Sequence, residues 1–152
     1  MYKNNPTSVL PVSVCVDATD LRGEIHRVVS GIVHGWQRLD AGDITISKMS
    51  GGNTNVLYKV DSPKLQESVV VRVFGIGTES FIDRAAENSA LCQLSEAGIA
   101  PSFHGLFENG RIEGYIEGRD LRPEELPLPK VMSAVAKQLA ALHRRPIRLI
   151  DS

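Results

Sequence analysis

The sequence predicts an α+β fold, a five-stranded antiparallel sheet with one helix between the third and fourth strands. Three strand-like segments follow one another between residues 43 and 74, and only turn-forming residues separate them. A helical pattern then spans residues 82–96, and two further short strands lie within residues 100–118. One helix precedes the first strand, and another follows the last.

Length and composition are those of one globular domain. The chain has 152 residues, 42% of them hydrophobic, and a formal net charge of -1, which suits a core of ordinary size. Basic residues are scattered among acidic ones, which argues against nucleic acid as a partner. Because no apolar run reaches roughly 18 residues and the start is polar, we expect neither a membrane span nor a signal peptide.

The two cysteines, Cys15 and Cys92, are far apart in the sequence and have no neighbouring histidines. This spacing favours free thiols over a disulfide or a metal site. We therefore expect a cytoplasmic protein without a bound zinc ion.

The first elements are a leader and a helix. Residues 1–19 form a flexible or strand-like leader, and Asp20 can cap the helix that follows over residues 20–36. Apolar residues recur at helical spacing through this segment: Leu21, Ile25, Val28, Val29, Ile32, Val33 and Trp36.

The three strands that follow span residues 43–49, 55–60 and 68–74. The first alternates apolar and polar residues, and the other two are rich in β-branched residues. The turn sequences SGGNTN and DSPKLQE join them. Successive strands with such short connections are expected to be antiparallel.

The second half begins with the helix over residues 82–96, which Gly98 should terminate. Two short strands then flank the turn ENGR, and a last amphipathic helix spans residues 130–144. This order of helices and strands is that of the small lobe of a protein-kinase-like fold.

We therefore expect three regions. Residues 1–19 are the leader, and residues 20–118 are the kinase-like N-terminal lobe. Residues 119–152 hold the last helix and the start of a second lobe.

Arg72 lies in the middle of the strand VVVRVF and shares one face with Val70 and Phe74. A cation on a partly covered face is costly without a partner. Glu87 lies on the apolar stripe of the following helix, which should face the sheet. We therefore expect Arg72 and Glu87 to form an ion pair.

Two interpretations of this pair are open. It can position nucleotide phosphates, as a basic strand residue and a helix glutamate do in protein kinases, or it can merely fix the helix on the sheet. The turn at residues 50–55 favours phosphate binding over a simple hairpin turn. Gly51 and Gly52 let backbone amides approach an anion closely.

Four segments resemble the N-terminal half of the choline/ethanolamine kinase family: SGGNTNVLYKV, VVVRVFGIGTESFIDRAAEN, LSEAGIAPSFHGLFENGRIEGYIEGRDL and AKQLAALH. They keep the family's order and spacing over about residues 47–143. The resemblance implies Mg-ATP-dependent phosphorylation of ethanolamine or choline, the first step towards the corresponding phospholipid. The segment LFENGRIEGYIEG favours ethanolamine.

The resemblance also implies a nucleotide-binding role for ten residues. The phosphate-binding hairpin would consist of Ser50, Gly51, Gly52, Thr54 and Asn55. Arg72 would replace the lysine of protein kinases, with Glu87 as its helix partner. The hinge strand, whose backbone binds adenine, would be Tyr115, Ile116 and Glu117. Asn53 departs from the family, which usually has an apolar residue there.

The sequence offers no catalytic or metal-binding residue. The family implies a catalytic loop with the pattern HxD…N and a later metal-binding aspartate, both from a second lobe, and neither occurs here. We expect His143 to close the last helix. We therefore expect this chain alone to bind ATP weakly and to be inactive, and its last helix to favour a homodimer.

Three functions are left open. The first is an ethanolamine or choline kinase, present here as its N-terminal lobe. The second is a non-catalytic module that binds nucleotide or pairs with a full-length kinase. The third is an aminoglycoside-type or other small-molecule kinase of the same superfamily.

Overall fold

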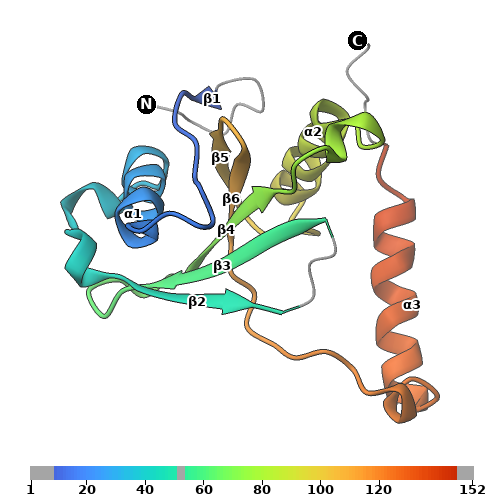
Figure 1. Ribbon diagram of the computed structural model, residues 1–152. Helices are drawn as coiled ribbons and strands as arrows, with labels where there is room; N and C mark the ends of the chain where they lie inside the picture. The colour runs from blue at the N-terminus through green and yellow to red at the C-terminus, as the bar shows by residue number, and fades with distance from the viewer. Residues whose placement is uncertain (1–8, 51–53, 147–152) are drawn as a thin grey trace.

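The computed structural model describes residues 9–50 and 54–146, and it confirms the predicted α+β class (Figure 1). The sheet has six strands in the order β1-β5-β6-β4-β3-β2, rather than the five that we predicted. The predicted five are β2 (Thr45–Met49), β3 (Asn55–Asp61), β4 (Val69–Phe74), β5 (Phe103–Phe107) and β6 (Gly110–Gly114). The neighbours among these five pair antiparallel.

The additional strand, β1 (Val9–Leu10), lies within the predicted leader and pairs parallel with the edge strand β5. Two residues are too few to show the alternation that identifies a strand. Val14 of the same segment is only 2% exposed and belongs to the core. Part of the leader thus packs on the lobe, while the three regional boundaries remain predictions.

Helix α1 (Leu21–Ile32) begins as predicted at Asp20, whose carboxylate accepts a hydrogen bond from the Gly23 backbone N–H at 2.9 Å. The helix ends at Ile32 and not at residue 36. Val33 has an extended backbone, with φ of -89° and ψ of 123°, and ends the helix, and Gly35 after it has a left-handed φ of 90°. Trp36 belongs to a short 3₁₀ turn instead and is buried there.

The main core lies between α1 and one face of the sheet. Apolar residues of α1 pack there with the residues of β4 that alternate with Arg72: Val69, Val71 and Val73. Full burial of each such side chain stabilises the fold by roughly 1.5–3 kcal/mol. The face of β4 that bears Arg72 is therefore turned away from α1.

Helix α2 (Arg84–Glu96) packs on the opposite face, where Leu91 and Cys92 contact Phe103 and Leu106 of β5. Asp83 caps its first turn by accepting a hydrogen bond from the Ala86 backbone N–H at 2.9 Å. The predicted stop at Gly98 is confirmed, because Gly98 has a φ of 68° directly after the helix.

Helix α3 (Pro129–His143) stands away from the sheet (Figure 1). Its apolar side chains Met132, Val135 and Leu139 are exposed. His143 is its last residue, as predicted. Among the helices of residues 9–50 and 54–146, we find none with the length and hydrophobicity that a membrane crossing requires.

Candidate functional site

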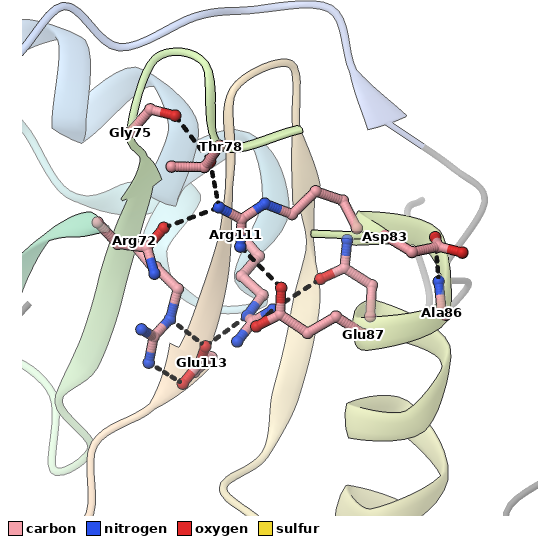
Figure 2. Close-up of polar contacts among 11 residues, drawn as sticks. Arg72, Gly75, Thr78, Asp83, Ala86, Glu87, Arg111 and Glu113 are labelled. Carbon is pink, nitrogen blue, oxygen red and sulfur yellow. Dashed lines mark hydrogen bonds and ion pairs between the residues drawn. The ribbon is translucent and has the colours of Figure 1, made fainter. Parts of the chain in front are cut away.

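Five charged residues meet on the face of the sheet that α2 covers in part (Figure 2). They are Arg72 of β4, Arg84 and Glu87 of α2, and Arg111 and Glu113 of β6. We call these five residues the charged cluster. Its members come from three elements that are distant in the sequence.

The register of β4 against β6 explains why Arg72, Arg111 and Glu113 meet at the centre of the charged cluster. Arg72 lies directly opposite Arg111 in the β4–β6 ladder, and two like charges in such a position repel each other. Glu113 lies two residues after Arg111 on the same face, so it can neutralise both arginines. Its Oε1 lies 2.7 Å from Nε of Arg72 and 2.5 Å from Nε of Arg111.

The predicted direct ion pair between Arg72 and Glu87 is wrong. Arg72 binds Glu113, whereas Glu87 lies 2.8 Å from Nη1 of Arg84 and 3.1 Å from Nη1 of Arg111. Arg111 lies between β4 and α2 and forms an ion pair with Glu87 in place of Arg72 (Figure 2). Among the described residues, the ion pairs that connect these two predicted residues run through Arg111 and Glu113.

Arg84 links α2 to the beginning of β3. Its Nη2 donates to Oδ1 of Asn55 at 3.2 Å and to Oγ1 of Thr78 at 2.5 Å. Its guanidinium carbon lies 4.3 Å from the centre of the Phe74 ring, a cation–π contact. Asn55, a predicted site residue, is thereby tied to the charged cluster.

The charged cluster is positive overall, because it contains three arginines and two glutamates. Burial by itself raises the pKa of Glu113, but the hydrogen bond from Arg72 and the charge of Arg111 outweigh this effect and hold the pKa below its usual value. The pKa of Glu87 is likewise lowered, because Arg84 and Arg111 outweigh its partial burial. Both carboxylates are therefore ionised at neutral pH.

The uncompensated positive charge is most accessible at Arg72. Its side chain is 23% exposed, against 15% for Arg84 and 6% for Arg111. Arg72 uses Nε and Nη2 to bind Glu113. Among the described residues, none accepts a hydrogen bond from its Nη1, so this nitrogen is available to an anion.

Ser50 directly follows β2, and Thr54 directly precedes β3. Ser50 is exposed, and the Thr54 carbonyl accepts a hydrogen bond from the Gly75 N–H at 2.8 Å, which holds the start of β3 beside the end of β4. The predicted site residues Gly51 and Gly52, together with Asn53, lie outside the described residues.

The predicted hinge residues directly follow β6. The Tyr115 backbone N–H donates to the Ser68 carbonyl at 3.1 Å, and the Tyr115 ring lies 4.4 Å from Nζ of Lys59. Ile116 and Glu117 are exposed. Tyr115, Ile116 and Glu117 thus follow the strand that carries Arg111 and Glu113, and among the described residues no hydrogen bond or ion pair joins their side chains to the charged cluster.

Sequence reasoning missed Arg84, Arg111 and Glu113. A signal for the last two was present in GRIEG, where a cation and an acid alternate within a strand and therefore share one face. The spacing of Arg84 and Glu87 by three residues in a helix also predicts contact. Neither signal identifies the partner of Arg72, because that depends on the pairing of β4 with β6.

Residues 46–149 match the family described as Choline/ethanolamine kinase, and this match includes the whole charged cluster. The chain belongs to the choline/ethanolamine kinase family. The family resemblance predicted from the sequence is thus confirmed.

Individual members of the choline/ethanolamine kinase family show the extent of the similarity. The chain is 37% identical over 106 residues to "Probable ethanolamine kinase A" of Dictyostelium discoideum, covering 66% of this chain and 30% of that protein. It is 36% identical over 104 residues to "Choline kinase" of Saccharomyces cerevisiae, covering 68% of this chain and 18% of the yeast protein.

Among solved structures, an ethanolamine kinase of Plasmodium vivax has a TM-score of 0.69 with 26% identity, covering 90% of this chain and 36% of the other. The chain thus spans about a third or less of the length of these choline/ethanolamine kinase relatives. Within residues 9–50 and 54–146, no three His, Cys, Asp or Glu side chains are grouped so as to hold a metal ion.

Proposed function

We propose that this chain forms the nucleotide-binding part of an ATP-dependent ethanolamine kinase, with choline kinase as the alternative. The main support is Arg72, which presents an unused nitrogen and the surplus charge of the charged cluster. Family membership and the relatives named ethanolamine kinase favour ATP and ethanolamine as substrates.

In this proposal, the phosphates of ATP bind at Arg72. A guanidinium donates charge-assisted hydrogen bonds to phosphate oxygens, and its planar fork fixes their direction. Ser50, Thr54 and Asn55 contribute donors from the hairpin before β3, together with the backbone at Gly51 and Gly52. The hydrogen bond from Arg84 of α2 to Asn55 supports a fixed position for the beginning of β3, where the hairpin turn ends.

The adenine end is proposed to lie at Tyr115, Ile116 and Glu117, whose backbone groups would bind the base. Their place directly after β6 supports this arrangement, because the strand that holds Glu113 beside Arg72 then leads into the adenine-binding segment. Glu87 contributes indirectly, through its contacts with Arg84 and Arg111.

Phosphoryl transfer also requires a base near the acceptor hydroxyl and ligands for Mg²⁺. We assign neither to the described residues, because both inward-facing acids, Glu87 and Glu113, are already paired with arginines. Residues 1–152 alone are therefore proposed to bind the nucleotide without transferring phosphate.

A cytoplasmic location and a homodimer are further parts of the proposal. The exposed free thiol of Cys15 suits a reducing compartment. The exposed apolar side chains of α3 can mediate self-association. Sedimentation velocity over a range of concentrations tests the dimer, and the variant Leu139→Glu should shift the equilibrium towards the monomer.

Binding of a fluorescent ATP analogue to residues 1–152 tests the proposed nucleotide site. Arg72→Ala should abolish measurable binding, and Arg72→Lys should retain part of it, because the charge remains while the fork geometry is lost. Arg119→Ala removes an arginine whose ion pair with Glu125 lies outside the charged cluster, so it should bind normally. Equal binding by the parent and Arg72→Ala would contradict the assignment.

The acceptor is tested by incubating the protein that contains this chain with ATP and each candidate alcohol. Phosphorylation of ethanolamine in preference to choline is the expected result. Phosphorylation of an aminoglycoside but of neither amino alcohol would overturn the proposal.

A further inference from the structure

We infer that Glu113 of β6, rather than the helix residue Glu87, is the positioning residue that orients Arg72 towards phosphate. This inference rests on the proposed function. Nε of Arg72 lies 2.7 Å from Oε1 of Glu113, and Nη2 lies 3.3 Å from Oε2. This two-point contact occupies one edge of the planar guanidinium and leaves Nη1 directed away from the carboxylate.

Glu113 is itself held in place by Arg111. The two side chains are 7% and 6% exposed, and Nε of Arg111 lies 2.5 Å from Oε1 of Glu113. Nη1 of Arg111 donates to Oδ1 of Asn88 in α2 at 2.9 Å. Because rotation of Glu113 would leave the buried Nε–H of Arg111 without its acceptor, the carboxylate has one favourable orientation. Arg72 is therefore preorganised for an anion.

Glu87 occupies a different place in the same network. Its side chain is 36% exposed, and it contacts Arg84 and Arg111 but not Arg72. The ion pairs that link Glu87 to Arg72 among the described residues run through Arg111 and then Glu113. Removal of the Glu113 charge should therefore disturb nucleotide binding more than removal of the Glu87 charge.

The test is a double-mutant cycle on residues 1–152, with a fluorescent ATP analogue as the probe. Glu113→Gln should weaken binding by roughly tenfold to a hundredfold, which is typical for loss of a hydrogen bond between charged groups. In an Arg72→Lys background, which is expected to retain part of the binding, the same change should have a clearly smaller effect. A Glu113→Gln effect of equal size in both backgrounds would overturn the inference, and so would a larger effect of Glu87→Gln.

Two variants make this result specific. Glu113→Asp keeps the charge and should recover part of the affinity that Glu113→Gln loses. Glu125→Gln removes the acid of the exposed pair with Arg119 and should leave binding unchanged. Recovery by Glu113→Asp would not be expected if Glu113 only supported the local fold.

A second measurement does not need a folded Glu113 variant or a bound nucleotide. An arginine-selective NMR spectrum of the parent chain gives the Nε–H signal of Arg72, which is assigned by its loss in Arg72→Lys. The Nε–H proton of Arg72 should exchange with water more slowly than the Nε–H proton of Arg119. Exchange as fast as that of Arg119 would overturn the inference. A slow Arg72 signal together with no binding of the ATP analogue by the parent chain would instead overturn the proposed function.

Discussion

The side-chain amide of Asn109 hydrogen-bonds to both backbone polar groups of Val14. The Val14 N–H donates to Oδ1 at 2.9 Å, and Nδ2 donates to the Val14 carbonyl at 2.8 Å. Asn109 thus supplies hydrogen-bond partners for both polar groups of the buried Val14 backbone, as the backbone of a neighbouring strand would. This pair fixes the N-terminal segment to the turn between β5 and β6.

We predict that Asn109→Ala lowers the free energy of unfolding by about 1–3 kcal/mol, because it leaves buried backbone groups of Val14 without partners. Urea unfolding measures this change. Ser13→Ala is the matched control, since it removes only an exposed hydrogen bond to Glu108 in the same region. Its effect should stay within about 0.5 kcal/mol. Equal losses in the two variants would contradict the role of Asn109.

Gly110→Ala should destabilise the protein and also weaken nucleotide binding. A Cβ at this position would overlap with the backbone carbonyl oxygen of Arg72 and with the ring of Phe107. Because a backbone atom cannot rotate away, β4 and β6 must separate at the charged cluster, at a cost of about 1–3 kcal/mol or more. Gly42→Ala is the control, since its Cβ would meet no atom within 4 Å. Thermal unfolding and binding of the ATP analogue should both distinguish the two variants.

Acidification should destabilise the protein through Glu87 and Glu113. Both have a folded-state pKa below the ordinary value of 4.5, so the unfolded chain takes up their protons first. Their contribution to stability is complete above pH 4.5 and is lost as the pH falls below this value. The melting temperature should therefore decrease below pH 4.5. Glu113→Gln should show a shallower decrease of the melting temperature with falling pH. An unchanged slope would argue against a contribution of Glu113 to the acid sensitivity.

His104 should produce a separate pH dependence nearer neutrality. Burial lowers its pKa below the ordinary 6.5, although the charge of Glu67 opposes this effect. Below pH 6.5 the unfolded chain therefore binds more protons than the folded one, so stability falls as the pH decreases through this region. His104→Gln should remove this part of the slope, as measured by urea unfolding at pH 7.5 and at pH 5.5. An equal loss of stability between pH 7.5 and pH 5.5 in the parent and in His104→Gln would contradict this role of His104.

Local patterns were sufficient to predict most of the fold. Alternation in VVVRVF placed Arg72 on the face opposite the valines that pack on α1. The cap at Asp20 and the stop at Gly98 follow from side-chain and backbone chemistry that acts over a few residues. These features depend on neighbours in the sequence, which is why the sequence alone reveals them.

The partner of Arg72 could not be predicted in this way. The sequence favours Glu87 because it lies on the inward face of the helix that follows β4, whereas Glu113 is 41 residues from Arg72. Only the antiparallel register of β4 and β6 places Arg111 opposite Arg72 and lets it separate Arg72 from the helix acid. Strand β1 was missed for a related reason, since it is defined by its pairing with β5 and not by its own two residues.

The parallel pairing of β1 with β5 also sets an order of events during synthesis. Val9 pairs with Leu106, so β1 leaves the ribosome before its partner strand β5 has been made. At roughly 5–20 residues per second, this delay is on the order of ten seconds. During that time the apolar residues Leu10 and Val14 lack the partners that β5 and Asn109 provide, so chaperones that bind nascent chains can reach them.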